Sequence, residues 1–217
     1  MELRCKALLF DLDGVLVDSQ AVVERTWRRW AQRHRLDPDA ILRAAHGRRT
    51  SDTLKDAAPH LAPHTIDSEV AWLDASELAD VEGLRVVPGA NHLLSALPAT
   101  RWAIVTSCGR ALAQRRLASV GLPEPEVLVV SEDVTQGKPA PDGYRLAAAR
   151  LGYDAGSCVV FEDAPAGVAA GRAAGARVIG LMTTYLASDL RDTEATISDF
   201  TGLQVRTDHD GFWLRKL

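Results

Sequence analysis

Two carboxylates stand two residues apart directly after a short apolar run near the start of the chain. The run covers residues 7–10, and Asp11, Leu12, Asp13 and Gly14 follow it. Ionised carboxylates this close repel one another, and each raises the pKa of the other. A divalent cation such as Mg²⁺ removes that repulsion and prefers oxygen ligands. The spacing indicates a metal-assisted reaction centre, although a plain Asp-x-Asp-Gly turn fits these four residues equally well.

Polar side chains also follow three of the later apolar runs. They are Thr106 and Ser107 after the second run, Lys138 after the third, and Glu162 and Asp163 after the fourth. Taken singly, the hydroxyl and carboxylate pairs could cap the helices that follow them, and the lysine could be a solvated loop residue. Ligands of open α/β sheets, however, bind beyond the carboxyl ends of the strands. The joint occurrence at matching strand ends therefore predicts a single site.

These residue types together suit phosphoryl transfer. One carboxylate can attack phosphorus, a second can handle a proton, and a third can complete a cation site. A hydroxyl and an ammonium group can hold the remaining phosphoryl oxygens. Lys138 is the only lysine between Lys55 and Lys216, and a compact point charge suits a single phosphoryl oxygen.

Short apolar runs alternate with helical patterns over most of the chain. The runs are residues 7–10, 102–106, 127–130, 158–161 and 177–181, and the helical patterns are residues 110–120, 141–151 and 165–174. Nearly continuous apolar runs are typical of a parallel sheet that is covered on both faces. The alternation predicts an α/β fold with a doubly wound parallel sheet.

Residues 19–85 interrupt this alternation, because no strand pattern appears there. Helical spacing instead covers residues 21–34, 39–45, 51–58 and 66–81. We therefore expect a catalytic core of residues 1–16 and 86–217 and an inserted helical cap of residues 17–85, with hinges at 14–19 and 82–88 that let a lid close. Residues 203–217 carry an Asp210-Gly211 turn signal and predict a small C-terminal β-hairpin.

Composition narrows the classes of partner. The chain has 217 residues, 47% of them hydrophobic and 25% charged, with a net charge of −4. The chain has no excess of basic residues, which argues against binding to nucleic acid. It also has no apolar run long enough to span a membrane. The N-terminus has no signal-peptide pattern, and the three cysteines lack metal-ligand spacing. We expect a cytoplasmic monomer whose partner is a small molecule.

Four segments resemble the motifs of the haloacid dehalogenase (HAD) superfamily and occur in that family's order. They are residues 11–19 (DLDGVLVDS), 105–107 (VTS), 137–142 (GKPAPD) and 161–167 (FEDAPAG). The resemblance spans residues 7 to about 181, so it implies an HAD-like Rossmannoid core. The helical insert resembles the type 1 cap of the β-phosphoglucomutase-like branch. Residues 46–50 (HGRRT) and 87–90 (VPGA) look most like those of sugar-phosphate and glycerol-phosphate phosphatases.

The resemblance assigns a role to each matching position. It implies that Asp11 is the nucleophile that forms an aspartyl-phosphate and that Asp13 is the general acid/base. The implied phosphate-binding residues are Thr106, Ser107 and Lys138. The implied Mg²⁺ ligands are the Asp11 side chain, the Asp13 backbone carbonyl and Asp163, with Glu162 assisting directly or through water. The activity expected is a Mg²⁺-dependent phosphatase of small phosphorylated metabolites, with sugar phosphates favoured.

Other positions help to distinguish the expected phosphatase from other activities of the superfamily. Dehalogenases of the superfamily lack an Asp where Asp13 stands, which favours phosphate esters over carbon–halogen bonds. Mutases of the branch carry a His ten residues beyond that Asp, where this chain has Val23. A phosphosugar mutase therefore remains the first alternative, and a non-catalytic binding or regulatory module is the second. Arg49 is the candidate for substrate contact in the cap, with a surface helix-start residue as the equally weighted alternative.

Overall fold

A six-stranded parallel sheet forms the centre of the computed structural model, which describes residues 2–208 and 210–216. The strands lie in the order β6-β5-β2-β7-β8-β9. Their bounds are β2 (Ala7–Phe10), β5 (Trp102–Val105), β6 (Val127–Val129), β7 (Cys158–Glu162), β8 (Arg177–Leu181) and β9 (Ala195–Ile197). Phe10 pairs with Ile104 on one side and with Phe161 on the other. The carboxyl ends of these neighbouring strands therefore meet at one edge of the sheet.

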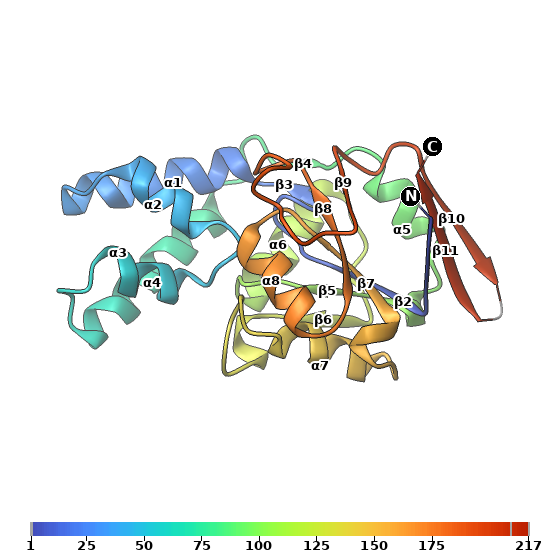
Figure 1. The fold of residues 1–217 in the computed structure, drawn as a ribbon. Helices are drawn as coiled ribbons and strands as arrows, with labels where there is room; N and C mark the ends of the chain where they lie inside the picture. The colour runs from blue at the N-terminus through green and yellow to red at the C-terminus, as the bar shows by residue number, and fades with distance from the viewer. Residues whose placement is uncertain (1, 209, 217) are drawn as a thin grey trace.

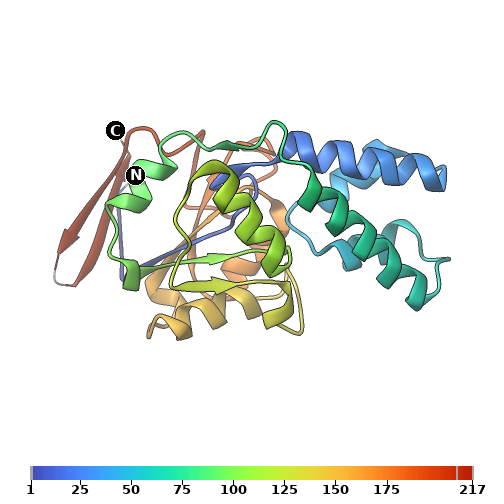
Figure 2. The same ribbon diagram turned by 180° about the vertical axis from the view of Figure 1, so that it is seen from behind.

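Helices cover both faces of this sheet (Figures 1 and 2). Leu8 and Phe10 face a core that includes residues of α5 (Ala90–Ser95) and α6 (Arg110–Val120). Ala7 and Leu9 face the opposite core, which includes residues of α7 (Asp142–Arg150) and α8 (Pro165–Ala173). Side chains alternate between the two faces of a strand, so an apolar run such as residues 7–10 can fill both cores. The predicted doubly wound α/β fold is confirmed.

Four helices leave the sheet after β2 and extend from one end of the molecule (Figure 1). They are α1 (Gln20–His34), α2 (Pro38–Ala45), α3 (Thr50–Ala57) and α4 (Pro63–Ala79), called here the helical insert. The insert has its own core, in which Trp27 and Trp30 are 4% and 0% exposed. The Trp30 Nε1–H donates a hydrogen bond of 2.8 Å to Glu69 Oε2. Both tryptophans are therefore packing residues of the insert.

The structure contains several short strands that the sequence did not predict. β3 (Val17–Asp18) and β4 (Arg85–Val86) pair antiparallel where the chain enters and leaves the insert. The expected hairpin forms from β10 (Leu203–Asp208) and β11 (Gly211–Lys216), and β1 (Glu2–Cys5) adds a third strand. β9 adds a sixth strand to the parallel sheet. Each missed strand has two to four residues, too few for a periodic pattern, and is defined by its partner.

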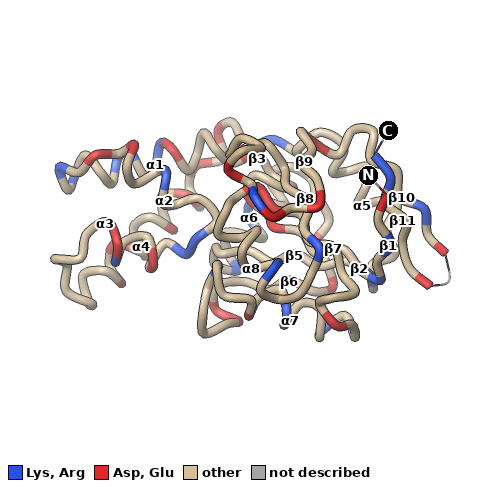
Figure 3. Tube along the Cα trace, in the orientation of Figure 1, with Lys and Arg blue, Asp and Glu red and all other residues tan. Residues whose placement is uncertain are grey.

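Acidic and basic residues are interspersed along the insert and the core (Figure 3). Short 3₁₀ helices, η1 (Ala99–Arg101), η2 (Ser131–Asp133) and η3 (Ala155–Ser157), complete the connections. No helix within the described ranges has the length and apolar character required to cross a bilayer.

Candidate active site

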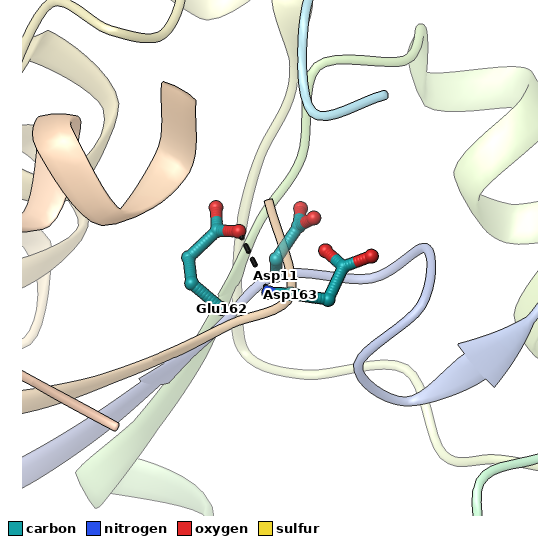
Figure 4. Close-up of side chains that lie close together, drawn as sticks. All are labelled: Asp11, Glu162 and Asp163. Atoms are coloured by element: carbon teal, nitrogen blue, oxygen red, sulfur yellow. Dashed lines mark hydrogen bonds between the residues drawn. The ribbon is translucent and has the colours of Figure 1, made fainter. Parts of the chain in front are cut away.

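Three carboxylates meet where β2 and β7 end. Asp11 follows β2, Glu162 is the last residue of β7, and Asp163 comes next. One oxygen atom from each lies within 4.8 Å of the others, and Figure 4 shows the three side chains on the same side of the strands. The Asp11 backbone N–H donates to the Phe161 carbonyl at 3.0 Å, which fixes the two strand ends side by side. All three residues are buried, so their negative charges require a compensating positive charge.

Lys138 supplies a positive charge from the loop before α7. Its Nζ lies 2.8 Å from Asp11 Oδ1 and 2.5 Å from Glu162 Oε1, and it donates to the Val105 carbonyl at 3.2 Å. Burial alone would lower the pKa of this lysine, but the two carboxylates raise it above its usual value. The ammonium group is therefore charged and fixed beside Asp11. Asp11, Lys138, Glu162 and Asp163 are called the strand-end cluster below.

Glu162 is held almost entirely by protein donors. Its Oε1 also accepts a hydrogen bond of 2.8 Å from the Tyr144 hydroxyl. Its Oε2 accepts from the backbone N–H groups of Asp163 at 3.0 Å and Ala164 at 3.3 Å. A Cβ atom at Gly167 would lie 1.7 Å from Oε1, so only glycine fits there. These contacts make Glu162 a partner that positions Lys138, and they leave little of its carboxylate for a cation.

The rest of the cluster fits a divalent cation. Asp163 Oδ1 is buried and has no hydrogen-bond partner within the described part of the chain. Burial, followed by the charges of Glu162 and Asp11, raises the pKa of Asp163 well above its usual value. Burial also raises the pKa of Asp11 to about 7, against the opposing effect of Lys138. One ammonium group does not offset three carboxylates, and an all-oxygen donor set suits Mg²⁺.

The two hydroxyl residues line the same space. Thr106 follows β5, and its backbone N–H donates to the Val129 carbonyl at 2.9 Å. The Cys108 backbone N–H donates to Thr106 Oγ1 at 3.2 Å, which orients that hydroxyl. A cavity of about 70 Å³ is lined by Thr106, Ser107, Asp11 and Asp13 together with residues of the insert. The structure therefore brings the predicted phosphate-binding and carboxylate residues together.

Asp13 has two partners, and one of them was absent from the sequence-based prediction. Its Oδ1 accepts a hydrogen bond of 2.7 Å from the Ser19 hydroxyl, and its Oδ2 contacts the Arg116 guanidinium of α6. The same guanidinium contacts Glu77 of α4 in the insert. Arg116 lies one helical turn from Leu112, on the buried face of α6. A charged residue on that apolar face is the sequence signal that marks Arg116.

The insert lies directly over the strand ends. Arg49 donates hydrogen bonds to the carbonyls of Ser131, Val134 and Thr135 at 3.0, 2.5 and 3.0 Å. The Ser107 hydroxyl donates to the Gly47 carbonyl at 3.0 Å. The Arg49 guanidinium therefore anchors the insert to the core, and its contact with a substrate stays a prediction.

A larger cavity of about 300 Å³ adjoins the cluster beside Asp13 and Asp163. Its lining combines glycine and apolar residues with charged residues and with the neutral polar residues Ser19, Gln20, His46, Thr183 and Thr184. Burial lowers the pKa of His46, so its imidazole is neutral near pH 7. Val23, at the position where mutases carry a histidine, lines both this cavity and the smaller one.

Comparison with known proteins agrees with this geometry. Residues 5–175 match the model of the family described as haloacid dehalogenase-like hydrolase. Hexitol phosphatase A of Escherichia coli (strain K12) is 41% identical over 211 residues, which cover 96% of this chain and 98% of that protein. Validoxylamine A 7'-phosphate phosphatase of Streptomyces hygroscopicus subsp. limoneus is 36% identical over 211 residues, with 95% and 98% covered.

A crystal structure of a hydrolase from Pseudomonas syringae superimposes with a TM-score of 0.82 at 25% identity, covering 90% of this chain and 94% of that one. The family match covers well over half of the chain and includes β2 and β7, whose ends carry the carboxylates of the strand-end cluster. The expected resemblance is confirmed, and the chain belongs to the haloacid dehalogenase-like hydrolases.

Proposed function

We propose that this chain is a Mg²⁺-dependent phosphatase of small phosphorylated metabolites, with sugar monophosphates as its substrates and Asp11 as its nucleophile. The chain is a phosphoric monoester hydrolase, in keeping with its phosphatase relatives. The observation that carries the finer proposal is the buried strand-end cluster, in which the Asp11 carboxylate lies 2.8 Å from the Lys138 ammonium group.

The side chains around the small cavity suit a two-step displacement. An Asp11 oxygen attacks phosphorus, the bond from phosphorus to the ester oxygen breaks, and Asp13 donates a proton to the departing oxygen. Asp13 then accepts a proton from water as that water attacks phosphorus, and the bond from phosphorus to Asp11 breaks. Lys138 and Thr106 would hold phosphoryl oxygens in both steps.

Asp11 and Asp163 would hold Mg²⁺ through their side chains, with the Asp13 backbone carbonyl as a third ligand. When bound, Mg²⁺ would neutralise charge on the phosphoryl oxygens and on the carboxylates. The Asp163 Oδ1 atom without a partner supports this assignment.

The larger cavity supports a neutral leaving group rich in hydroxyls. Gln20, Thr183 and Thr184 can donate and accept hydrogen bonds with hydroxyl groups. Arg85 is the only arginine or lysine among the described residues that line this cavity, and it lies on an exposed strand opposite Asp18. A second phosphate would meet this one arginine together with the carboxylates of Asp13, Asp18 and Asp163, which would repel it. A substrate with one phosphate on a sugar or polyol therefore fits best.

The residue at position 23 favours transfer of phosphate to water over a mutase reaction. Val23 offers no proton donor or acceptor beside the site, in contrast to the histidine of the mutases. The helical insert would act as the cap that excludes bulk water, with residues 17–85 as one unit and residues 1–16 and 86–217 as the other.

A phosphate-release assay with a panel of sugar and polyol monophosphates, sugar bisphosphates and sugar acid phosphates tests the proposal. We expect release from the monophosphates, loss of release with a chelator, and recovery when Mg²⁺ is added back. Folded, Mg²⁺-loaded protein that releases no phosphate from any ester would contradict the proposal and favour a non-catalytic module. Conversion of β-glucose 1-phosphate to glucose 6-phosphate in the presence of a bisphosphate primer would favour the mutase.

A further inference from the structure

A buried arginine joins the core to the helical insert through the side chain of Asp13. Arg116 belongs to α6, packed against the sheet, and Glu77 belongs to α4 of the insert. One guanidinium nitrogen contacts Asp13 Oδ2 and the other contacts Glu77 Oε2. Asp13, Arg116 and Glu77 are called the bridging cluster below.

Burial makes this contact unlike a surface ion pair. The Arg116 side chain is 4% exposed and the Glu77 side chain is 10% exposed. An exposed pair contributes little to stability or orientation, because water competes for both charges. A buried guanidinium instead depends on its partners, since removing one of them leaves an uncompensated charge. Arg116 is therefore tied to both carboxylates for as long as the insert is seated.

The guanidinium geometry links the orientations of the two carboxylates. The group is planar and its nitrogens project in fixed directions, so a contact on one nitrogen limits where the other nitrogen lies. Glu77 restrains Arg116 from the insert side, and Arg116 restrains Asp13 Oδ2 from the core side. Ser19 restrains the other Asp13 oxygen, Oδ1, at 2.7 Å. Movement of α4 away from α6 would remove the outer restraint.

We propose that Arg116 is a positioning residue that transmits the seating of the insert, through Glu77, to the side chain of Asp13. Protonation of the leaving group is thereby confined to the state in which the insert covers the strand ends. This inference rests on the proposed role of Asp13 as the general acid. Restricting proton transfer to the closed state limits unproductive reaction with water, which enters when the insert is displaced.

The test compares two esters that differ in their need for a proton. Glucitol 6-phosphate releases an alcohol, which requires a proton as it departs, whereas p-nitrophenyl phosphate releases a stabilised phenolate that does not. For Arg116→Met we expect kcat on glucitol 6-phosphate to fall about 100-fold, within the range that general acid catalysis contributes. On p-nitrophenyl phosphate we expect the first rapid release of p-nitrophenolate, which precedes hydrolysis of the aspartyl-phosphate, to change by less than about threefold, because this step needs Asp11 but no proton from Asp13.

Variants on the insert side test the same link without touching α6. We expect Glu77→Gln to lower kcat on glucitol 6-phosphate in the same direction, by about tenfold, and the double variant with Arg116→Met to be no worse than Arg116→Met alone. Arg115→Met and Asp67→Asn are the matched controls, because both residues are exposed on the same two helices. We expect neither control to change the ratio of the activity on glucitol 6-phosphate to the activity on p-nitrophenyl phosphate.

Two results would overturn the inference. Equal losses in the first step on both substrates in folded variants would mean that the bridging cluster only attaches the insert, and unchanged activity on both would remove Arg116 from the mechanism. If Arg116→Met does not fold, the ratio of the activities of Glu77→Gln on the two esters decides between these outcomes. A wild-type protein that hydrolyses neither ester overturns the proposed function and the inference together, whereas an active wild type with equal losses overturns the inference alone.

Discussion

The strand-end cluster and the bridging cluster each place one buried cation between two carboxylates, but they differ in what holds them. Lys138 lies between Asp11 and Glu162, and the core supplies all three residues. Arg116 lies between a core residue and a residue of the insert. The first cluster is therefore complete whatever the position of the insert, and the second is complete only when the insert is seated.

The two clusters also differ in charge. The strand-end cluster has three carboxylates and one ammonium group, so it retains an excess of negative charge that a divalent cation can offset. The bridging cluster has two carboxylates and one guanidinium; Arg116 and Glu77 are 4% and 10% exposed, whereas the Asp13 side chain is 27% exposed. Burial raises the pKa of Glu77 to about 7, against the effect of Arg116, which shows how costly that position is for a charge. We infer that the strand-end cluster takes part in bond formation. The bridging cluster, in contrast, determines when Asp13 is positioned to transfer a proton.

Replacing the proposed nucleophile should have the largest effect on activity, and it changes the strand-end cluster while leaving the bridging cluster intact. We expect Asp11→Asn to lower kcat by about 10⁴-fold or more on every ester, because the amide cannot serve as the proposed nucleophile. The amide has nearly the same shape, so the fold and the bridging cluster should persist. Steady-state assays and circular dichroism provide the measurements, with Asp56→Asn, whose side chain is 64% exposed, as the control. Residual activity above about one tenth of wild type would assign the nucleophile elsewhere.

Removing the ammonium group tests whether the core depends on the strand-end cluster. We expect Lys138→Met to cost about 3–5 kcal/mol in the free energy of unfolding, because Asp11 and Glu162 would be left as uncompensated buried charges. Denaturant titration measures this cost. Lys55→Met is the control, since its side chain is 61% exposed. A cost no larger than that of the control would mean that the carboxylates are neutral without Lys138.

Gly167→Ala perturbs the same cluster through the position of Glu162. The added Cβ would lie 1.7 Å from Glu162 Oε1, so the carboxylate or α8 must move. We expect a loss of about 1–3 kcal/mol, which corresponds to a fall in Tm of roughly 2–4 °C for each kcal/mol. Gly156→Ala is the control, because its nearest neighbour would be at 3.6 Å. Equal Tm values for the two variants would contradict the packing argument.

Magnesium affinity should depend on pH through the strand-end cluster. The pKa of Asp11 is raised to about 7, so below pH 7 its carboxyl group holds a proton that Mg²⁺ must displace. Apparent affinity should therefore rise with pH, by up to about tenfold for each pH unit and each displaced proton, and the raised pKa of Asp163, the other side-chain ligand, adds to this rise. Calorimetric titration at pH 6, 7 and 8 measures this trend, and a flat profile would contradict it.

The sequence predicted the strand-end cluster well because each of its residues belongs to a local pattern. Asp11, Lys138 and Asp163 all follow apolar runs, and the rules of parallel sheets place such residues at one edge. The contact between Arg116 and Glu77 was not predictable in this way. It joins helices of the core and the insert, and its existence depends on how the insert is seated, which periodicity does not encode.

Arg49 illustrates a second limit. The sequence left Arg49 open between a contact with substrate and a surface residue at a helix start, and its hydrogen bonds go to the backbone carbonyls of Ser131, Val134 and Thr135. Carbonyl groups are common to all residues, so no sequence pattern identifies them as partners. β9 was not predicted for a similar reason. Its three residues are too few for a recognisable pattern, and they form a strand only because they pair with β8.

The pairing of β3 with β4 ties together the two points where the chain crosses between core and insert. Val17 lies opposite Val86, and the Val87 N–H donates to the Leu16 carbonyl at 3.0 Å. Because the two crossings form one hydrogen-bonded ribbon, neither can swing without twisting the other. We therefore expect any displacement of the insert to carry both crossings together, and lengthening one crossing alone would disrupt the register of this pair.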